Sequence, residues 1–242
     1  MITTATSQIE QFERNLDRQE DFITQKIKAE YRSDKQSVLN NFYCFDNSNI
    51  MLMGENLSVC GYMTEEQVEE LLSFCQFMGV YGLESRQDNL PVPHRNIMHL
   101  MTFKGGQGCD CPQIIKNENI YQFSQFSCSN FPGSAFNMVY SYLARKVNRG
   151  VSDIYYLEHN GKIVSGALAT HFDHCIYLTF VSTARNFRNQ GLARQVINHI
   201  ICHNPGKDVM LMCEDELMAF YEKLCFEKTG EIYLYKLREE HI

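Results

Sequence analysis

A run of five apolar residues at 209–213, Val-Met-Leu-Met-Cys, limits the folds open to this chain of 242 residues. An apolar run without alternation predicts a strand that is buried on both faces. Apolar residues at helical spacing precede it at 192–201 and follow it at 217–224, so a helix is expected on each side. A strand reached through a helix crosses over and lies parallel to its neighbour. The sequence therefore predicts a mixed sheet with helices on both faces.

The rest of the second half supplies antiparallel neighbours for this strand. Two strand-like segments, 153–159 and 162–172, flank Asn160-Gly161, a dipeptide that suits the type I′ turn of a hairpin. A third strand follows at 175–182, and an alternating segment at 232–237 closes the chain. With an amphipathic helix at 135–147, the predicted order is helix, three antiparallel strands, helix, strand, helix, strand.

The first half predicts a separate, smaller α/β domain. One amphipathic helix is expected within residues 6–31, and short strands within 40–62. Thr64 and Gln67 form a capping box that opens a helix ending at Gly79, and strands follow on both sides of a turn-rich segment. Residues 104–112 are rich in glycine and lack periodicity, which is typical of a linker. We therefore expect domains at 1–108 and 109–242.

Charge and targeting features restrict the partners. Lys and Arg number 22 against 29 Asp and Glu, a net charge of −7, which disfavours nucleic acid and favours a cationic amine. No signal peptide or membrane-spanning run is present, so a cytoplasmic protein without a membrane partner is expected. Most of the ten cysteines stand singly among apolar residues, as reduced thiols do. Homodimer formation stays open.

Two short motifs raise the question of a metal site. Cys109-Asp-Cys111 lacks a second pair or a nearby His at ligand spacing, so incidental thiols are expected there. His171-Phe-Asp-His174 lies between two predicted strands and is interpreted as a hairpin turn with solvated imidazoles. The sequence therefore predicts no metal.

The segment after the strand at 175–182 has the features of an anion site. Arg188-Asn-Gln-Gly191-Leu-Ala193 opens a helix, where free backbone N–H groups and the positive end of the helix dipole meet. Gly191 lets a ligand approach the backbone, and Arg188 adds a cation. An ordinary helix start with a glycine cap is the alternative interpretation.

Thirty residues after Gly191 comes Phe220-Tyr-Glu-Lys-Leu-Cys-Phe226. The two motifs at this spacing resemble the acyl-CoA pyrophosphate loop and the tyrosine motif of the GCN5-related N-acetyltransferase (GNAT) family. The resemblance covers roughly residues 113–242. It implies a GNAT acyl-CoA N-acyltransferase fold, here preceded by the smaller α/β domain, with acetyl-CoA as cosubstrate and no metal.

The resemblance also implies roles for individual residues. The backbone of Val181, Ser182 and Thr183 would pair with the pantetheine arm like an added strand. Tyr221 would protonate the departing CoA thiolate, whereas its spacing in the helix also fits a core tyrosine. The residues whose amides would hold the pyrophosphate are Arg188, Asn189, Gln190, Gly191, Leu192 and Ala193.

This sequence departs from the family pattern at three points. Glu214 stands where the family often has an Asn that helps to hold the cofactor, and we place Glu214 among the cofactor-binding residues. Cys225 replaces the usual Gly after the last helix. The strand at 175–183 has no acidic residue to act as a general base. Glu158, Asp173, Glu214 or a water chain remain candidates, or the amine arrives neutral and needs none.

The resulting functional hypothesis is an N-acetyltransferase that moves an acetyl group from acetyl-CoA to an amine of a small molecule or peptide. The alternative is a non-catalytic module of the same fold that binds acyl-CoA as a sensor or scaffold. The first half repeats the order strand, helix, strand without a glycine loop. A degenerate second GNAT-like lobe and an extension that shapes the substrate cleft are both consistent with it.

Overall fold

The computed structural model describes residues 1–33, 40–103, 110–131, 133 and 135–238. They form two compact units, the first of Met1–Leu100 with the segment from Gly230 onward and the second of Met101–Thr229. The predicted linker falls largely within residues 104–109, outside the described residues, and so does the boundary after residue 108. The domain limits of 1–108 and 109–242 therefore stay a prediction.

The second unit is a mixed sheet with strand order β11-β10-β9-β8-β7. Strands β10 and β11 run parallel, with Cys175 opposite Asp208, and the other pairs are antiparallel. The parallel crossover expected from the apolar run at 209–213 is confirmed. The elements are β7 (Ile115–Lys116), α4 (Ile120–Asn130), α5 (Phe136–Asn148), β8 (Ser152–His159), β9 (Lys162–His171), β10 (Cys175–Thr183), the short 3-10 helix η1 (Arg185–Phe187), α6 (Leu192–Cys202), β11 (Asp208–Cys213) and α7 (Asp215–Glu222).

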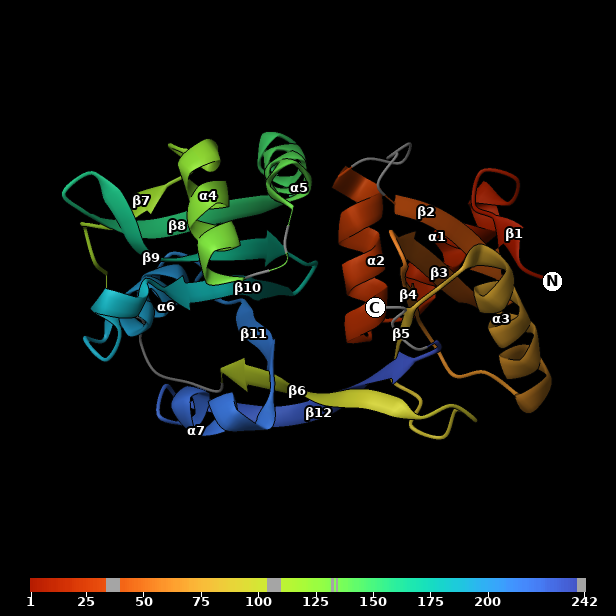
Figure 1. Cartoon of the computed structure of the whole chain (residues 1–242). Coiled ribbons are helices and arrows are strands. Elements are labelled where there is room, and N and C mark those ends of the chain that lie inside the picture. The colour runs from red at the N-terminus through yellow and green to blue at the C-terminus, as the bar shows by residue number, and fades with distance from the viewer. Residues whose placement is uncertain (34–39, 104–109, 132, 134, 239–242) are drawn as a thin grey trace. The chain divides into compact units, whose positions relative to one another are not determined.

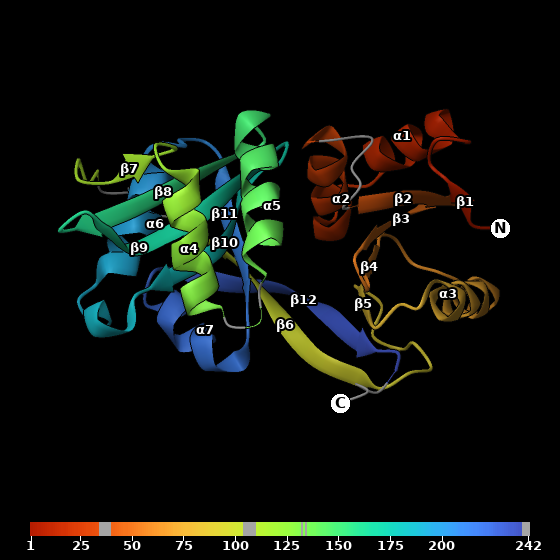
Figure 2. The same ribbon diagram turned by 45° about the horizontal axis from the view of Figure 1, so that its top comes forward.

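Helices cover both faces of this sheet, as predicted (Figures 1 and 2). Successive side chains of a strand point to opposite faces. On β8, Tyr155 and Leu157 belong to the apolar cluster that includes residues of α6, whereas Ile154 and Tyr156 pack with α4 and α5. The unit therefore has one core on each side of the sheet.

Local turn chemistry explains the hairpin of β8 and β9. Asn160 and Gly161 have φ values of 51° and 70°, the left-handed backbone that a type I′ turn needs, so the predicted hairpin is confirmed. The interpretation of His171–His174 as a turn is also confirmed, because Phe172 donates to the carbonyl of Cys175 between β9 and β10.

The first unit contains a sheet of order β1-β2-β3-β4-β5-β12. Its core includes Leu57, Leu71, Leu83 and Tyr235. Strands β6 (His94–Phe103) and β12 (Phe226–Lys236) each begin in one unit and end in the other. The remaining elements are β1 (Thr3–Thr4), α1 (Ile9–Arg18), α2 (Phe22–Ser33), β2 (Asn40–Phe45), β3 (Ser48–Met53), β4 (Asn56–Val59), α3 (Glu65–Met78) and β5 (Gly82–Ser85).

The single helix expected within residues 6–31 is wrong, because the segment folds as α1 and α2 with a break between them. At the break, the Asp21 carboxylate accepts hydrogen bonds from the backbone N–H groups of Ile23 and Thr24 at 3.0 and 3.2 Å. These bonds satisfy amides of the first turn of α2 and start a new helix. Apolar spacing alone does not reveal such a cap.

The helix α3 begins and ends as predicted. Thr64 and Gln67 cap each other, and Gly79 ends the helix in the left-handed conformation. Strands β4 and β5 on either side of α3 are parallel, so β4-α3-β5 is the same kind of crossover as β10-α6-β11 in the second unit. Among the described helices, none combines the length and the apolar character that a bilayer crossing requires.

Candidate functional site

A cavity of about 460 Å³ lies in the second unit, between the end of β10, the start of α6 and the helix α7. Gln190 and Glu214 are not part of its described lining. The predicted site residues that line it are Val181, Ser182, Thr183, Arg188, Asn189, Gly191, Leu192, Ala193 and Tyr221.

Strand β10 leaves its parallel neighbour before it reaches the cavity. The register with β11 ends at the pair Leu178 and Leu211, while β10 continues beside β9 as far as Thr183. The register with β9 shifts between Thr179 and Ser182, and Phe180 within this bulge has a φ of 52°. Beyond Leu178, the edge of β10 that faced β11 therefore has no ladder partner from β11. An extended ligand can pair with such an edge.

The loop between β10 and α6 presents backbone N–H groups to the same cavity. Asn189 and Gly191 have φ values of 60° and 75°, and no side chain caps the helix that Gly191 opens. A Cβ built on Gly191 would have no atom within 4 Å, so the space beside it is open. The first-turn amides of α6 and the positive end of its dipole are thus available to an anion.

The charges around the cavity also favour an anion. Arg188 and Arg194 line it, and its described lining contains no carboxylate and no imidazole. The side chain of Arg188 is oriented by a hydrogen bond from Nε to the carbonyl oxygen of Thr183 at 3.2 Å. Thr183 in turn is held by Ser165, whose hydroxyl lies 2.9 Å from Thr183 Oγ1.

Tyr221 belongs both to the cavity and to the core. It is 6% exposed, and its ring packs edge-on against Phe220 and Phe226 at centroid distances of 5.0 and 5.8 Å. Burial, with a smaller contribution from Cys213, raises the pKa of Tyr221 to about 12. At this pKa the hydroxyl stays protonated at neutral pH. No described residue hydrogen-bonds it, so it is available as a donor.

The candidate bases do not gather at the cavity. Glu214 is exposed at the N-cap of α7, and neither Glu158 nor Asp173 is part of the described lining. Cys225 adopts a φ of 64°, so the backbone bends there as it would for the expected glycine.

Several lining residues were not anticipated from the sequence. Leu217 and Phe220 are 49% and 39% exposed, although the helical spacing of Leu217 and Tyr221 suggested one core stripe. Asn130 and Phe131 come from the end of α4, a helix that the apolar pattern did not reveal. The unanticipated residues are Asn130, Phe131, Phe187, Arg194, Leu217 and Phe220.

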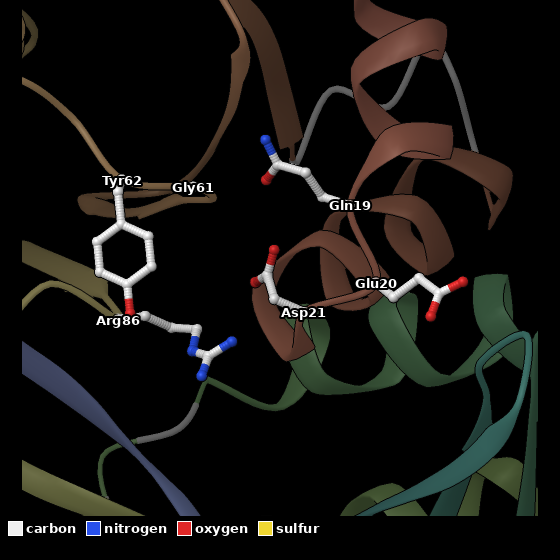
Figure 3. A pocket seen from close by; sticks show the side chains of 6 residues that line it. All are labelled: Gln19, Glu20, Asp21, Gly61, Tyr62 and Arg86. Carbon is white, nitrogen blue, oxygen red and sulfur yellow. The ribbon is translucent and has the colours of Figure 1, made fainter.

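A second pocket, of about 260 Å³, lies in the first unit (Figure 3). The Asp21 carboxylate there caps α2, and Gln19 Nε2 donates to the carbonyl of Asn47 at 2.8 Å. Figure 3 shows the Glu20 side chain directed away from Tyr62 and Arg86. The Asp21 and Gln19 side chains of this pocket thus stabilise the local fold. The cavity of the second unit is therefore the stronger candidate site.

Comparison with known proteins gives the context of this site. Residues 120–226 match the sequence model of the acetyltransferase (GNAT) family, a range that runs from α4 through α7 and includes the whole loop before α6. Among curated proteins, no significant sequence match was found.

Solved structures share the fold at low identity. A GCN5-related N-acetyltransferase from Kribbella flavida is 12% identical with a TM-score of 0.61, covering 91% of this chain and 95% of that chain. A Drosophila protein is 9% identical with a TM-score of 0.64, covering 98% and 97%. A tandem GNAT protein from the clavulanic acid biosynthesis pathway is 10% identical with a TM-score of 0.53, covering 84% and 80%.

Proposed function

We propose that this chain, in which residues 120–226 form a domain of the acetyltransferase (GNAT) family, transfers an acetyl group from acetyl-CoA to an amine. One observation carries the proposal. The unpaired end of β10, the uncapped start of α6 and the buried Tyr221 meet in a single cavity. A CoA thioester, whose pantetheine arm runs from the pyrophosphate to the leaving sulfur, needs these three features.

The fit to acetyl-CoA follows the cavity from end to end. The backbone of Val181, Ser182 and Thr183 pairs with the amides of the pantetheine arm. The amides from Asn189 to Ala193 and the positive end of α6 hold the pyrophosphate. The backbone N–H of Arg188 donates to the carbonyl of Arg185 at 3.4 Å, so Arg188 contributes the charge of its guanidinium. Gln190 takes part through its backbone only, and Glu214 is left out because neither side chain reaches the cavity.

The reaction is a direct acyl transfer. The amine lone pair attacks the thioester carbonyl carbon, a backbone donor stabilises the oxyanion, and the carbon–sulfur bond then breaks. The sulfur takes the proton of the Tyr221 hydroxyl, and the proton of the new ammonium passes to water. Water then returns a proton to the Tyr221 phenolate, which restores the site. The described lining offers no carboxylate or imidazole as base, so the amine enters neutral or loses its proton through water.

The raised pKa of Tyr221 sets a condition on this step. With a pKa of about 12 for the hydroxyl, proton transfer to an exposed thiolate of ordinary pKa is uphill by about 5 kcal/mol. The same apolar surroundings raise the pKa of a thiol held beside the ring, which reduces the difference. Tyr221 therefore acts on a sulfur that is desolvated in the cavity.

The first unit, in this proposal, does not bind a second cofactor. Its β4-α3-β5 crossover matches the arrangement of β10-α6-β11, which supports a degenerate lobe of the same origin. However, the first turn of α3 is closed by its own side chains, because Thr64 Oγ1 accepts from the Gln67 backbone and Gln67 Oε1 accepts from the Thr64 backbone. A pyrophosphate would have to displace both bonds.

The nine described cysteines are all free thiols, which supports a reducing compartment such as the cytoplasm.

The competing function is a non-catalytic acyl-CoA sensor. The lack of a base among the described lining residues is the observation that favours it.

One experiment separates the two functions. The full chain is mixed with acetyl-CoA and a panel of small amines and peptides, thiol release is recorded, and CoA binding is measured by calorimetry. An acetyltransferase binds CoA and releases thiol with at least one amine. Binding without thiol release across the panel favours the sensor, and the absence of CoA binding contradicts both.

A further inference from the structure

Three side chains of the second unit converge at the far end of α6. His199 and His203 lie one turn apart on this helix, and Asp110 approaches them from the segment before β7. Asp110 Oδ1 lies 3.0 Å from His199 Nδ1 and 3.8 Å from His203 Nε2. One ligand atom from each residue falls within 4.8 Å of the other two.

These spacings suit a small tetrahedral ion. Zinc binds imidazole nitrogen and carboxylate oxygen at about 2.0–2.2 Å, which places two ligand atoms of a tetrahedron roughly 3.3–3.5 Å apart. The two separations from Asp110 Oδ1, 3.0 and 3.8 Å, bracket that value. The ligand atoms of all three residues lie within 4.8 Å of one another, close enough to converge on one ion.

Hydrogen bonds orient both imidazoles for this role. His203 Nδ1 lies 3.0 Å from the carbonyl oxygen of His199, to which it donates, and its Nε2 lone pair is therefore left toward Asp110. The backbone N–H of Cys111 donates to His199 Nδ1 at 3.4 Å, so this nitrogen is unprotonated, and an ion bound to it would replace this long hydrogen bond. The carboxylate thus faces two acceptors, an arrangement that a cation among them would stabilise.

Burial and ring stacking hold the His199 imidazole in place. The His199 side chain is only 10% exposed, and its ring stacks on His203 with centroids 4.0 Å apart.

We propose that Asp110, His199 and His203 bind a divalent transition-metal ion of the zinc class, with water as the fourth ligand. Two imidazoles and one carboxylate favour zinc over magnesium or calcium, which prefer oxygen ligands. The expectation of no metal rested on the absence of a His near Cys109-Asp-Cys111 in the sequence, and the fold supplies two.

The ion has a structural role in this proposal. Gly191 and His203 are twelve residues apart along α6, about 18 Å along the helix axis, so the metal does not reach the acyl cavity. The ion joins the segment at Asp110 to the C-terminal end of α6. The N-terminal end of the same helix lines the acyl cavity.

The test uses the full chain, stripped of metal with a chelator and titrated with zinc chloride by calorimetry. One equivalent of zinc binds the wild type, and His203→Gln weakens this binding at least tenfold. His174→Gln is the matched control, since His174 is exposed, lies in the same unit and is outside the cluster. At a zinc concentration near the dissociation constant of the wild type, zinc raises the melting temperature of the wild type and the control more than that of His203→Gln.

Cobalt substitution identifies the ligands. Nitrogen and oxygen ligands give weak visible bands, whereas thiolates add an intense charge-transfer band in the near ultraviolet. The absence of one-to-one zinc binding overturns the proposal. So does binding that His203→Gln and Asp110→Asn leave unchanged, or a cobalt spectrum dominated by thiolate bands.

Discussion

The Nε atom of Arg188 donates a hydrogen bond to the carbonyl oxygen of Thr183 across 3.2 Å, which ties the loop before α6 to the end of β10. The two cofactor-binding parts of the proposed site, the strand edge and the amide loop, are therefore linked through one side chain. The bond uses only Nε, so the terminal nitrogens of the guanidinium stay available for a phosphate.

Replacing Arg188 by Gln is expected to weaken CoA binding about tenfold or more. A hydrogen bond to a charged group contributes about 1.5–3 kcal/mol, and about 1.4 kcal/mol corresponds to a factor of ten in affinity. The salt dependence of binding falls as well, because one cation is lost. Calorimetry at two salt concentrations measures both. Arg185→Gln, on exposed η1 outside the described lining, is the control, and equal affinities in the two variants contradict the assignment.

Gly191→Val tests the open space beside the amide loop. Gly191 and Gly150 have φ values of 75° and 68°, and a Cβ added at either glycine would have no atom within 4 Å. Valine at either site incurs a similar left-handed backbone cost of about 1–2 kcal/mol. Both variants should lose similar thermal stability, but only Gly191→Val should weaken CoA more than tenfold. Unchanged CoA affinity in a folded Gly191→Val protein rules out the loop assignment.

Tyr221→Phe separates a catalytic hydroxyl from a packing role. The variant keeps the ring contacts with Phe220 and Phe226 and removes only the proton donor. Loss of general-acid catalysis lowers kcat by roughly 100-fold with little change in KM for acetyl-CoA. Tyr177→Phe, at a buried tyrosine outside the described lining, should retain normal turnover. Normal kcat in Tyr221→Phe would leave the residue with a packing role alone.

Asp153 predicts how the stability of the second unit depends on pH. Burial acts to raise its pKa, but hydrogen bonds from His171 and Asn117 and the ion pair with Lys116 outweigh burial and lower the pKa below its usual range. A depressed pKa in the folded state stabilises the protein above the unfolded value of about 4. This stabilisation is lost as the pH falls from there through the folded value.

Asp153→Asn should therefore lower the melting temperature at pH 7, since hydrogen bonds to a charged group contribute about 1.5–3 kcal/mol and the half-exposed Lys116 adds less. The difference from the wild type should shrink below pH 4. Thermal unfolding between pH 2.5 and 7 measures it, with Asp17→Asn as an exposed ion-pair control. If the difference in melting temperature between Asp153→Asn and the wild type stays constant over this pH range, the substitution acts through the shape of the side chain rather than through its charge.

Local chemistry made part of this structure predictable. The Asn160-Gly161 turn, the Thr64 capping box and the strand at 209–213 each depend on residues that are close in sequence. The helix start within the loop from Arg188 to Ala193 could be predicted for the same reason, because the glycine and the first helical residues are adjacent in sequence. The expectation that the strand at 209–213 is buried on both faces is wrong, because Met210 and Met212 are only half-buried.

The unpredicted features depend on residues that are distant in sequence or on weak local signals. Asp110 and His199 are 89 positions apart, and no spacing rule connects them. Helix α4 is rich in serine and phenylalanine, which have modest helix propensity, and it is stabilised by packing Phe123 and Phe126 on the sheet. The break after α1 depends on a side-chain cap whose effect the apolar pattern hides.

The pairing of Tyr233 with Ser85 has a consequence for how the protein is made. The first unit is completed by a strand that the ribosome delivers only after residues 101–229 have been synthesised. Tyr233 is 148 positions after Ser85, so at about 5–20 residues per second the edge of β5 stays without this partner for roughly 7–30 s. During translation this exposed edge is open to pairing with other chains, so the nascent protein is most vulnerable to aggregation while its second unit is emerging.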